Sequence, residues 1–220
     1  MWYSQNLNLK QFNMERLKII SPGKTSEKIH GIAVFAVFPI IGAPKKSFEI
    51  FLELLEARAQ KEDVMITIIT NRTDELTSST EEKVRAHHVE NFAWLAEQHR
   101  MLIRDGVIAV GFPEPLESDN DLVDKSGYGM YAKHILSQTL PLVFHLGTRL
   151  AVYKDENYKL DRFFEAELEY HKDDDIRVHS SLEDFVEAVV ELVKGQLLRL
   201  KLREGARMIQ GTSIPESYID

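Results

Sequence analysis

The feature that most constrains the fold is a short apolar run, Val107 to Gly111, which stops at two prolines, Pro113 and Pro115. A run without polar positions is typical of a strand buried on both faces. Proline lacks the backbone N–H that a sheet ladder needs, so the strand is expected to end there. Because strands buried on both faces belong mainly to parallel sheets covered by helices, this run predicts an α/β fold.

Two earlier apolar runs have the same character, Ile32 to Phe38 and Val64 to Thr70. The segment between them repeats apolar residues at three- and four-residue spacing, which predicts a helix with one inward face: Phe48, Phe51, Leu52, Leu55 and Ala59. Strand, helix and strand in this order form the crossover unit that joins parallel strands.

The remaining elements are predicted from capping signals and periodicity. A helix is expected from about 80 to 104, and further helices over 130–137, 161–170 and from Ser180 onward; strands are expected at 140–144 and 176–178. Together these predict a three-layer, Rossmann- or flavodoxin-like α/β domain. Its mostly parallel, five-stranded sheet has helices on both faces.

Three segments are expected along the chain: an extension over residues 1–28, one domain over 29–200 and a C-terminal tail over 201–220. Within the extension, Met14 to Ile20 fits a short strand or a short helix. The tail is expected to fray from Gly205.

Composition excludes several classes of function. The net charge of −8 and the pI near 5.5 argue against a general nucleic-acid surface, which needs a basic field. The chain has no cysteine, so disulfides and thiolate metal sites are excluded. No apolar run approaches the roughly 20 residues of a membrane helix, and no signal-peptide pattern is present. We therefore expect a cytoplasmic protein without a membrane partner.

An acidic loop and a glycine pair follow the strand at 107–111. The loop carries five carboxylates: Glu114, Glu117, Asp119, Asp121 and Asp124. In an open α/β sheet, ligands bind beyond the carboxyl ends of the strands. Carboxylates there can serve as a general base, as a nucleophile or as partners of ribose hydroxyls, or they can form a solvated loop.

Gly127 and Gly129 can bring backbone N–H groups close to a ligand at a helix start, or they can simply make a turn. The loop at the end of the first strong strand, with Pro39 and Gly42, is the expected opposite wall of a site. Phe38 before it can stack on a base or can belong to the core.

The segment D-K-S-G-Y-G-M-Y-A, Asp124 to Ala132, resembles the D-S-G-T-A-x-E motif of one enzyme family. This is the nucleoside 2-deoxyribosyltransferase and 2'-deoxynucleoside 5'-phosphate N-hydrolase family. Leu140 to Phe144 is similar to its K-P-V-L-x-L strand, and Ser181 to Asp184 to the start of its last helix. The similarity spans roughly residues 90 to 195. It implies a nucleoside- or nucleotide-binding protein that acts on the N-glycosidic bond as an N-glycosidase or deoxyribosyltransferase.

The positions of these loops and the resemblance together give the candidate site residues. Asp124 and Tyr131 are the candidate catalytic residues, with Asp124 as acid or base; Tyr131 stands where the family has its catalytic glutamate. The candidate ligand-binding residues are Phe38, Pro39, Gly42, Glu114, Ser126, Gly127, Tyr128 and Gly129. The tyrosine leaves three alternatives open: a displaced carboxylate, a relative that binds without hydrolysis, or a coincidental resemblance. A non-catalytic interaction or sensor protein is therefore the alternative function.

Other motifs are absent or incomplete. Gly23-Lys24-Thr25 lacks the glycine that a phosphate-binding loop requires, because Lys18 stands there. No G-x-G-x-x-G, G-x-S-x-G or H-x-x-x-H pattern occurs, so we expect no NAD or other cofactor, no serine-hydrolase elbow and no histidine metal site. A weaker alternative is that the loop carboxylates act with a metal such as Mg²⁺.

The segment from Lys194 to Arg207 combines cations with leucines. A basic amphipathic helix can meet a membrane surface or an acidic partner. A solvated helix end, with cations favoured by the helix dipole, is an alternative. A third is an oligomer contact through its leucines: Leu197, Leu198, Leu200 and Leu202. We expect a homo-oligomer.

Overall fold

The computed structural model describes residues 14–20, 28–38, 43–70, 104–113, 125–158, 160, 162–171 and 176–211. Its strands are β1 (Leu17–Ile20), β2 (Ile32–Val37), β3 (Ile66–Thr70), β4 (Val107–Phe112), β5 (Arg149–Lys154) and β6 (Ile176–His179). Its helices are α1 (Ala43–Lys61), α3 (Lys125–Leu146), α4 (Arg162–Tyr170) and α5 (Leu182–Gly211). The expected helix at 80–104 lies outside the described residues.

The strands form one sheet in the order β1-β3-β2-β4-β5-β6, and every described pair is parallel. The predicted α/β class with helices on both faces is confirmed, with six strands rather than five. Without β1, the order from β3 to β6 is the doubly wound, flavodoxin-like one, which reverses direction between β2 and β4.

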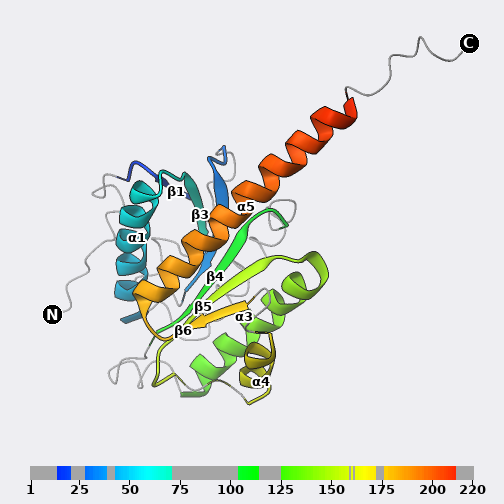
Figure 1. Ribbon diagram of the computed structural model, residues 1–220. Helices are drawn as coiled ribbons and strands as arrows, with labels where there is room; N and C mark the ends of the chain where they lie inside the picture. The colour runs from blue at the N-terminus through cyan, green and yellow to red at the C-terminus, as the bar shows by residue number, and fades with distance from the viewer. Residues whose placement is uncertain are drawn as a thin grey trace, which may run out of the picture.

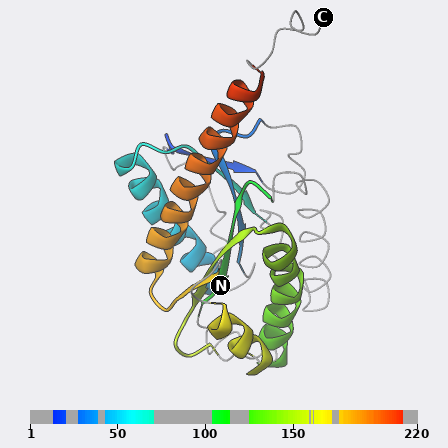
Figure 2. The same cartoon turned by 45° about the vertical axis from the view of Figure 1, so that its right-hand side comes forward.

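The two faces of the sheet carry different helices (Figures 1 and 2). Alternate residues of a strand point to opposite faces, and β2 shows this directly. Val34 and Ala36 join the apolar cluster that α1 and α5 cover, whereas Phe35 and Val37 join the one that α3 and α4 cover. Since all of these residues are buried, β2 lies between two cores.

The strand expected at 140–144 is wrong, because these residues belong to α3. Leu136, Leu140 and Val143 are buried at four- and three-residue spacing, which is a helical period. The Thr139 hydroxyl donates to the carbonyl of Ile135, one turn back. Gly147, at φ 63°, ends the helix and donates its N–H to the carbonyl of Val143.

The true next strand is β5, whose apolar centre is only Leu150 to Val152, between Arg149 and the half-buried Tyr153 and Lys154. Because its ends are charged, this strand does not appear as a long apolar run in the sequence. The expected helix at 161–170 and the short strand at 176–178 are confirmed as α4 and β6. The helix expected at 130–137 is the middle of the longer α3.

Both ends of the expected domain need correction. Residues 17–20 form β1, the edge strand of the sheet, which pairs with β3. The Glu56 carboxylate of α1 holds its start by accepting N–H groups from Glu15, Arg16 and Leu17 at 2.9–3.3 Å. At the other end, α5 continues to Gly211, so residues 201–211 of the expected tail are helical, including 205–211, which were expected to fray. Both views show α5 crossing the sheet and extending past its edge (Figures 1 and 2).

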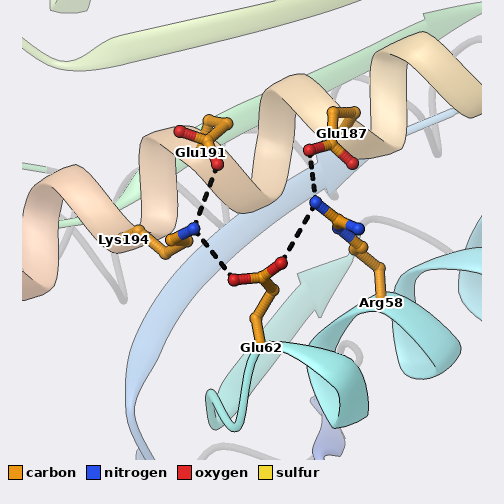
Figure 3. A network of polar contacts seen from close by, with 5 residues as sticks. All are labelled: Arg58, Glu62, Glu187, Glu191 and Lys194. Carbon is orange, nitrogen blue, oxygen red and sulfur yellow. Dashed lines mark hydrogen bonds and ion pairs between the residues drawn. The ribbon is translucent and has the colours of Figure 1, made fainter.

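An ion-pair network joins α1 to the first half of α5 (Figure 3). Glu62 lies 2.9 Å from Lys194 Nζ and 3.1 Å from Arg58, and Lys194 and Arg58 also contact Glu191 and Glu187 of α5. The hydrogen bond from Lys194 lowers the pKa of Glu62, and the same bond raises the pKa of Lys194. The network fixes how the two helices lie on their shared face.

Candidate functional site

The strand order places a topological switch point between β2 and β4. After β2 the chain enters α1 on one face of the sheet, and after β4 it enters α3 on the other. The helices that follow β2 and β4 therefore lie on opposite faces of the sheet. In doubly wound sheets, ligands bind outside the carboxyl ends of the strands at such a point. The topology makes this edge the candidate site.

The base of this edge is an aromatic cluster. Phe38, directly after β2, is fully buried, and its ring centroid lies 5.2 Å from those of Phe48 and Phe51 and 6.2 Å from that of Phe185. A Cβ on Gly111 of β4 would lie 2.2 Å from Phe38 Cε1, so only glycine leaves room for the ring. Phe38 is thus a core residue here, and the expected stacking of its ring on a base does not fit this arrangement.

The predicted glycine pair lies at the start of α3. The helix begins at Lys125, so Ser126, Gly127 and Gly129 fall within its first two turns, followed by Tyr131. The first N–H groups of a helix have no partner within the helix, and the helix dipole makes them favourable for anions. Because α3 follows β4 in a parallel sheet, these groups lie at the carboxyl edge.

Of the other predicted residues, Tyr128 is in the same turns of α3, and only the backbone of α3 is described there. Pro39, Gly42, Glu114 and Asp124 lie outside the described residues. Because β2 and β4 are neighbouring parallel strands, Phe38 after β2 and the start of α3 after β4 lie at the same edge of the sheet.

The end of β5 has a structural role. The Asp155 N–H donates to the Phe112 carbonyl at 3.0 Å, and the Asp155 carboxylate accepts the N–H of Asn157. Lys154 Nζ donates to the Tyr158 carbonyl at 3.0 Å, and the buried Tyr158 ring stacks on Phe112 at 5.2 Å. These contacts hold the turn after β5 against the end of β4, next to the switch point.

His179 is a carboxyl-edge residue that lies just outside the predicted strand at 176–178. It is the last residue of β6 and pairs in register with Tyr153 of β5. Burial lowers the pKa of His179, opposed by the carboxylate of Asp184 and assisted by Arg177. Its Nε2 is buried and has no hydrogen-bond partner in the described part of the chain. A neutral imidazole next to the start of α5 can accept or donate one hydrogen bond. Its position directly before the Ser180–Ser181 cap is the sequence signal that could have identified it.

Among the described residues, no three histidine or acidic side chains lie close enough to hold a metal ion. None of the described helices is long and apolar enough to cross a lipid bilayer.

Comparison of the chain with protein-family models, with curated proteins and with solved structures gives no match. The class of protein is therefore defined by the fold and the strand order alone. It is a flavodoxin-like parallel α/β protein. The likeness to the deoxyribosyltransferase family rests on the sequence motifs alone.

Proposed function

We propose that this protein binds a nucleoside or nucleotide at the β2–β4 switch point and acts on its N-glycosidic bond, as an N-glycosidase or deoxyribosyltransferase. The observation that supports the proposal most is the strand order, which reverses between the two strands whose following loops carry the candidate residues. The motif-bearing segment begins α3 directly after this reversal.

The start of α3 supplies the binding chemistry. Gly127 and Gly129 have no side chains to keep a phosphate or a sugar oxygen away from the free N–H groups of the first turn. Asp124 immediately precedes the helix, where its carboxylate can exchange a proton with water or with the leaving base. Tyr131 follows one turn further on as a ligand contact. The chemistry replaces the C1'–N bond of the substrate by a C1'–O bond to water, or by a bond to another base.

Ligand-induced stabilisation and release of free base test this function together. A bound ligand at about 100 times its Kd stabilises the native state by about 2.7 kcal/mol, which a thermal-shift panel of nucleosides, nucleotides and NAD detects. Chromatography of the reaction mixture reports the free base. Asp124→Asn is expected to abolish base release and keep the fold, whereas Glu53→Gln, on the exposed side of α1, leaves both unchanged. The proposal fails if no compound on the panel stabilises the protein and no base is released.

A non-catalytic interaction or sensor role is the second candidate. The observation in its favour is the exposure of Leu198 and Leu202 on the projecting part of α5, far from the carboxyl edge. Replacing Asp124 and Tyr131 by alanine separates the two functions. A nucleotide enzyme loses ligand binding or turnover, while an interaction protein keeps its partner.

A further inference from the structure

A pocket of about 350 Å³ lies at the amino edge of the sheet, opposite the edge that holds the candidate site. Its lining comes from the turn before β4, from the end of α3 and from the second half of α5: Arg104, Asp105, Leu146, Arg199, Leu202 and Arg203. Three arginines thus line one pocket in a chain whose net charge is −8. We call this surface the arginine pocket.

Two contacts hold α5 against the turn before β4. The buried Gln196 donates from its Nε2 to the carbonyl of Gly106 at 3.1 Å, and its Oε1 accepts from Arg199 Nη1 at 3.2 Å. One turn further along α5, Arg203 is ion-paired with Asp105. Both arginines of α5 are therefore positioned before any ligand binds. A site formed in advance loses less conformational freedom on binding, which favours affinity.

The lining of the arginine pocket has an excess of positive charge. Asp105 compensates Arg203, whereas Arg104 and Arg199 have no carboxylate partner in the described part of the chain. Two positive charges therefore remain. A concave site with charge of one sign concentrates its field and attracts an anion. A phosphate monoester, with a charge of about −1.5 to −2 near pH 7, matches this excess, and guanidinium groups bind phosphate oxygens in pairs.

Two leucines give the pocket an apolar wall. Leu146, at the end of α3, and Leu202 line the pocket and are 41% and 64% exposed. Leu198, one turn before Leu202, is 60% exposed and extends this apolar surface along α5. The end of α4 does not cover it, because His171 packs on Phe144 and no described residue of α4 lines the pocket. A phosphate alone would leave the leucines in water, whereas an apolar chain attached to it would cover them.

We propose that the arginine pocket binds a phosphate monoester that carries an apolar chain. Arg104 and Arg199 contact the phosphate oxygens, and the apolar chain lies over Leu146 and Leu202. Two sources offer this chemistry, a soluble alkyl phosphate and the headgroup of phosphatidic acid in a lipid surface. The site lies at the amino edge, so the proposal does not rest on the nucleotide-binding function at the carboxyl edge.

Isothermal titration calorimetry of the full chain with octyl phosphate tests the proposal. The wild type is expected to bind octyl phosphate at least about tenfold more tightly than inorganic phosphate, which lacks the apolar chain. Octanol, which lacks the charge, is expected not to bind. Arg199→Glu is expected to raise the Kd for octyl phosphate by more than about tenfold, because a carboxylate that repels phosphate replaces a cation.

Lys201→Glu is the matched control. It makes the same charge change on the same part of α5, but Lys201 is exposed and does not line the pocket, so octyl phosphate is expected to bind as it does to the wild type. Circular dichroism melts confirm that each variant is folded. The proposal is overturned if the wild type binds octyl phosphate no more tightly than inorganic phosphate. It is also overturned if Lys201→Glu loses as much affinity as Arg199→Glu, since the general field of the helix would then be responsible.

Two further variants separate the charge of the pocket from its apolar wall. Arg104→Gln removes a cation from the turn before β4 and is expected to weaken both octyl phosphate and inorganic phosphate. Leu202→Ser is expected to weaken octyl phosphate several-fold and to leave inorganic phosphate unchanged. Equal losses for both ligands in Leu202→Ser would contradict the apolar contact.

Vesicles of phosphatidylcholine, with and without phosphatidic acid, identify the source of the ligand. Cosedimentation that requires phosphatidic acid, and that Arg199→Glu abolishes while Lys201→Glu retains it, would assign the pocket to the lipid headgroup. Binding of octyl phosphate without cosedimentation would assign it to a soluble phosphate monoester.

Discussion

The two halves of α5 differ in what they contact. The first half, from Leu182 to about Leu197, covers the sheet beside α1, with Phe185, Val189 and Val193 fully buried. The second half extends past the sheet, and its described side chains, at 198–206, are exposed apart from the half-buried Leu200. Where α5 buries little surface, its helical conformation depends on the intrinsic helix propensities of Leu, Lys, Arg and Glu.

This difference shows that one part of the helix stabilises the fold, whereas the other is available for binding. In the first half an apolar side chain stabilises the fold, and its removal is felt in the free energy of unfolding. In the second half the exposed Leu198 and Leu202 contribute little to the fold, and exposed apolar side chains that gather together commonly mark binding surfaces. Matched substitutions in the two halves of α5 test this distinction between stabilising and binding side chains.

The largest effect is expected from Phe185→Ala. Phe185 is fully buried and packs its ring 5.4 Å from Phe51 and 6.1 Å from Tyr153. Truncating such a ring costs about 3–5 kcal/mol, because it removes apolar contacts and leaves a cavity. Urea unfolding followed by circular dichroism measures the loss. Phe163→Ala is the exposed control, and an equal loss in both variants would contradict the role given to burial.

Gly111→Ala is expected to cost about 1–3 kcal/mol, as overpacking of a core usually does. The new Cβ would lie 2.2 Å from the Phe38 ring, which Phe48, Phe51 and Phe185 hold in place. Adding Phe38→Leu to Gly111→Ala should recover part of the loss, because the smaller side chain vacates the space. If Gly111→Ala unfolds at the wild-type urea concentration, the close packing of β4 on Phe38 is wrong.

The sequence predicted the centre of the sheet and missed its periphery for physical reasons. β2, β3 and β4 are buried on both faces, so their residues need no polar alternation and appear as unbroken apolar runs. β5 ends in half-buried charged residues, and the more apolar segment at 140–144 was mistaken for it. The helical spacing of Leu136, Leu140 and Val143 distinguishes the two interpretations.

For the candidate site, the sequence predicted its topological place and the start of α3, but no contact between distant residues. The fit of Phe38 against Gly111 depends on β2 and β4 being neighbours, which no local pattern reveals. The same is true of His179, whose place beside Tyr153 depends on the pairing of β5 with β6. Local patterns predict elements, whereas pairing between elements decides which side chain is enclosed.

His179, the last residue of β6 before α5, is expected to make stability depend on pH. Burial holds its folded pKa below the ordinary 6.5, so folding favours the neutral form. This contribution is complete above pH 6.5 and is lost as the pH falls through the folded pKa. Relative to His179→Gln, the wild type should therefore lose free energy of unfolding on acidification below 6.5. Urea titrations of both proteins across this range measure it, and parallel pH profiles would refute it.

A smaller effect is expected from Glu62→Gln in the network between α1 and α5. These partly exposed ion pairs are weakened by salt, so the substitution should lower the urea midpoint slightly at low ionic strength and hardly at all in 1 M salt, where screening acts over about 3 Å. Because Lys194 lowers the pKa of Glu62 below 4.5, the difference should also vanish as the pH falls through that lowered pKa. A salt-independent difference would mean that packing, not charge, is responsible.

The smallest effect is expected from Leu202→Ser, which matches Leu192→Ser in the packed half of the same helix. Leu192 is 4% exposed and Leu202 is 64% exposed. An exposed substitution changes stability by about 0.5 kcal/mol or less, so Leu202→Ser should unfold at nearly the wild-type urea concentration while Leu192→Ser unfolds well below it. If Leu202→Ser is instead destabilised as strongly as Leu192→Ser at protein concentrations where the chain is monomeric, the end of α5 packs on its own domain. Destabilisation that grows with protein concentration would show that Leu202 is buried between copies, since association couples stability to concentration.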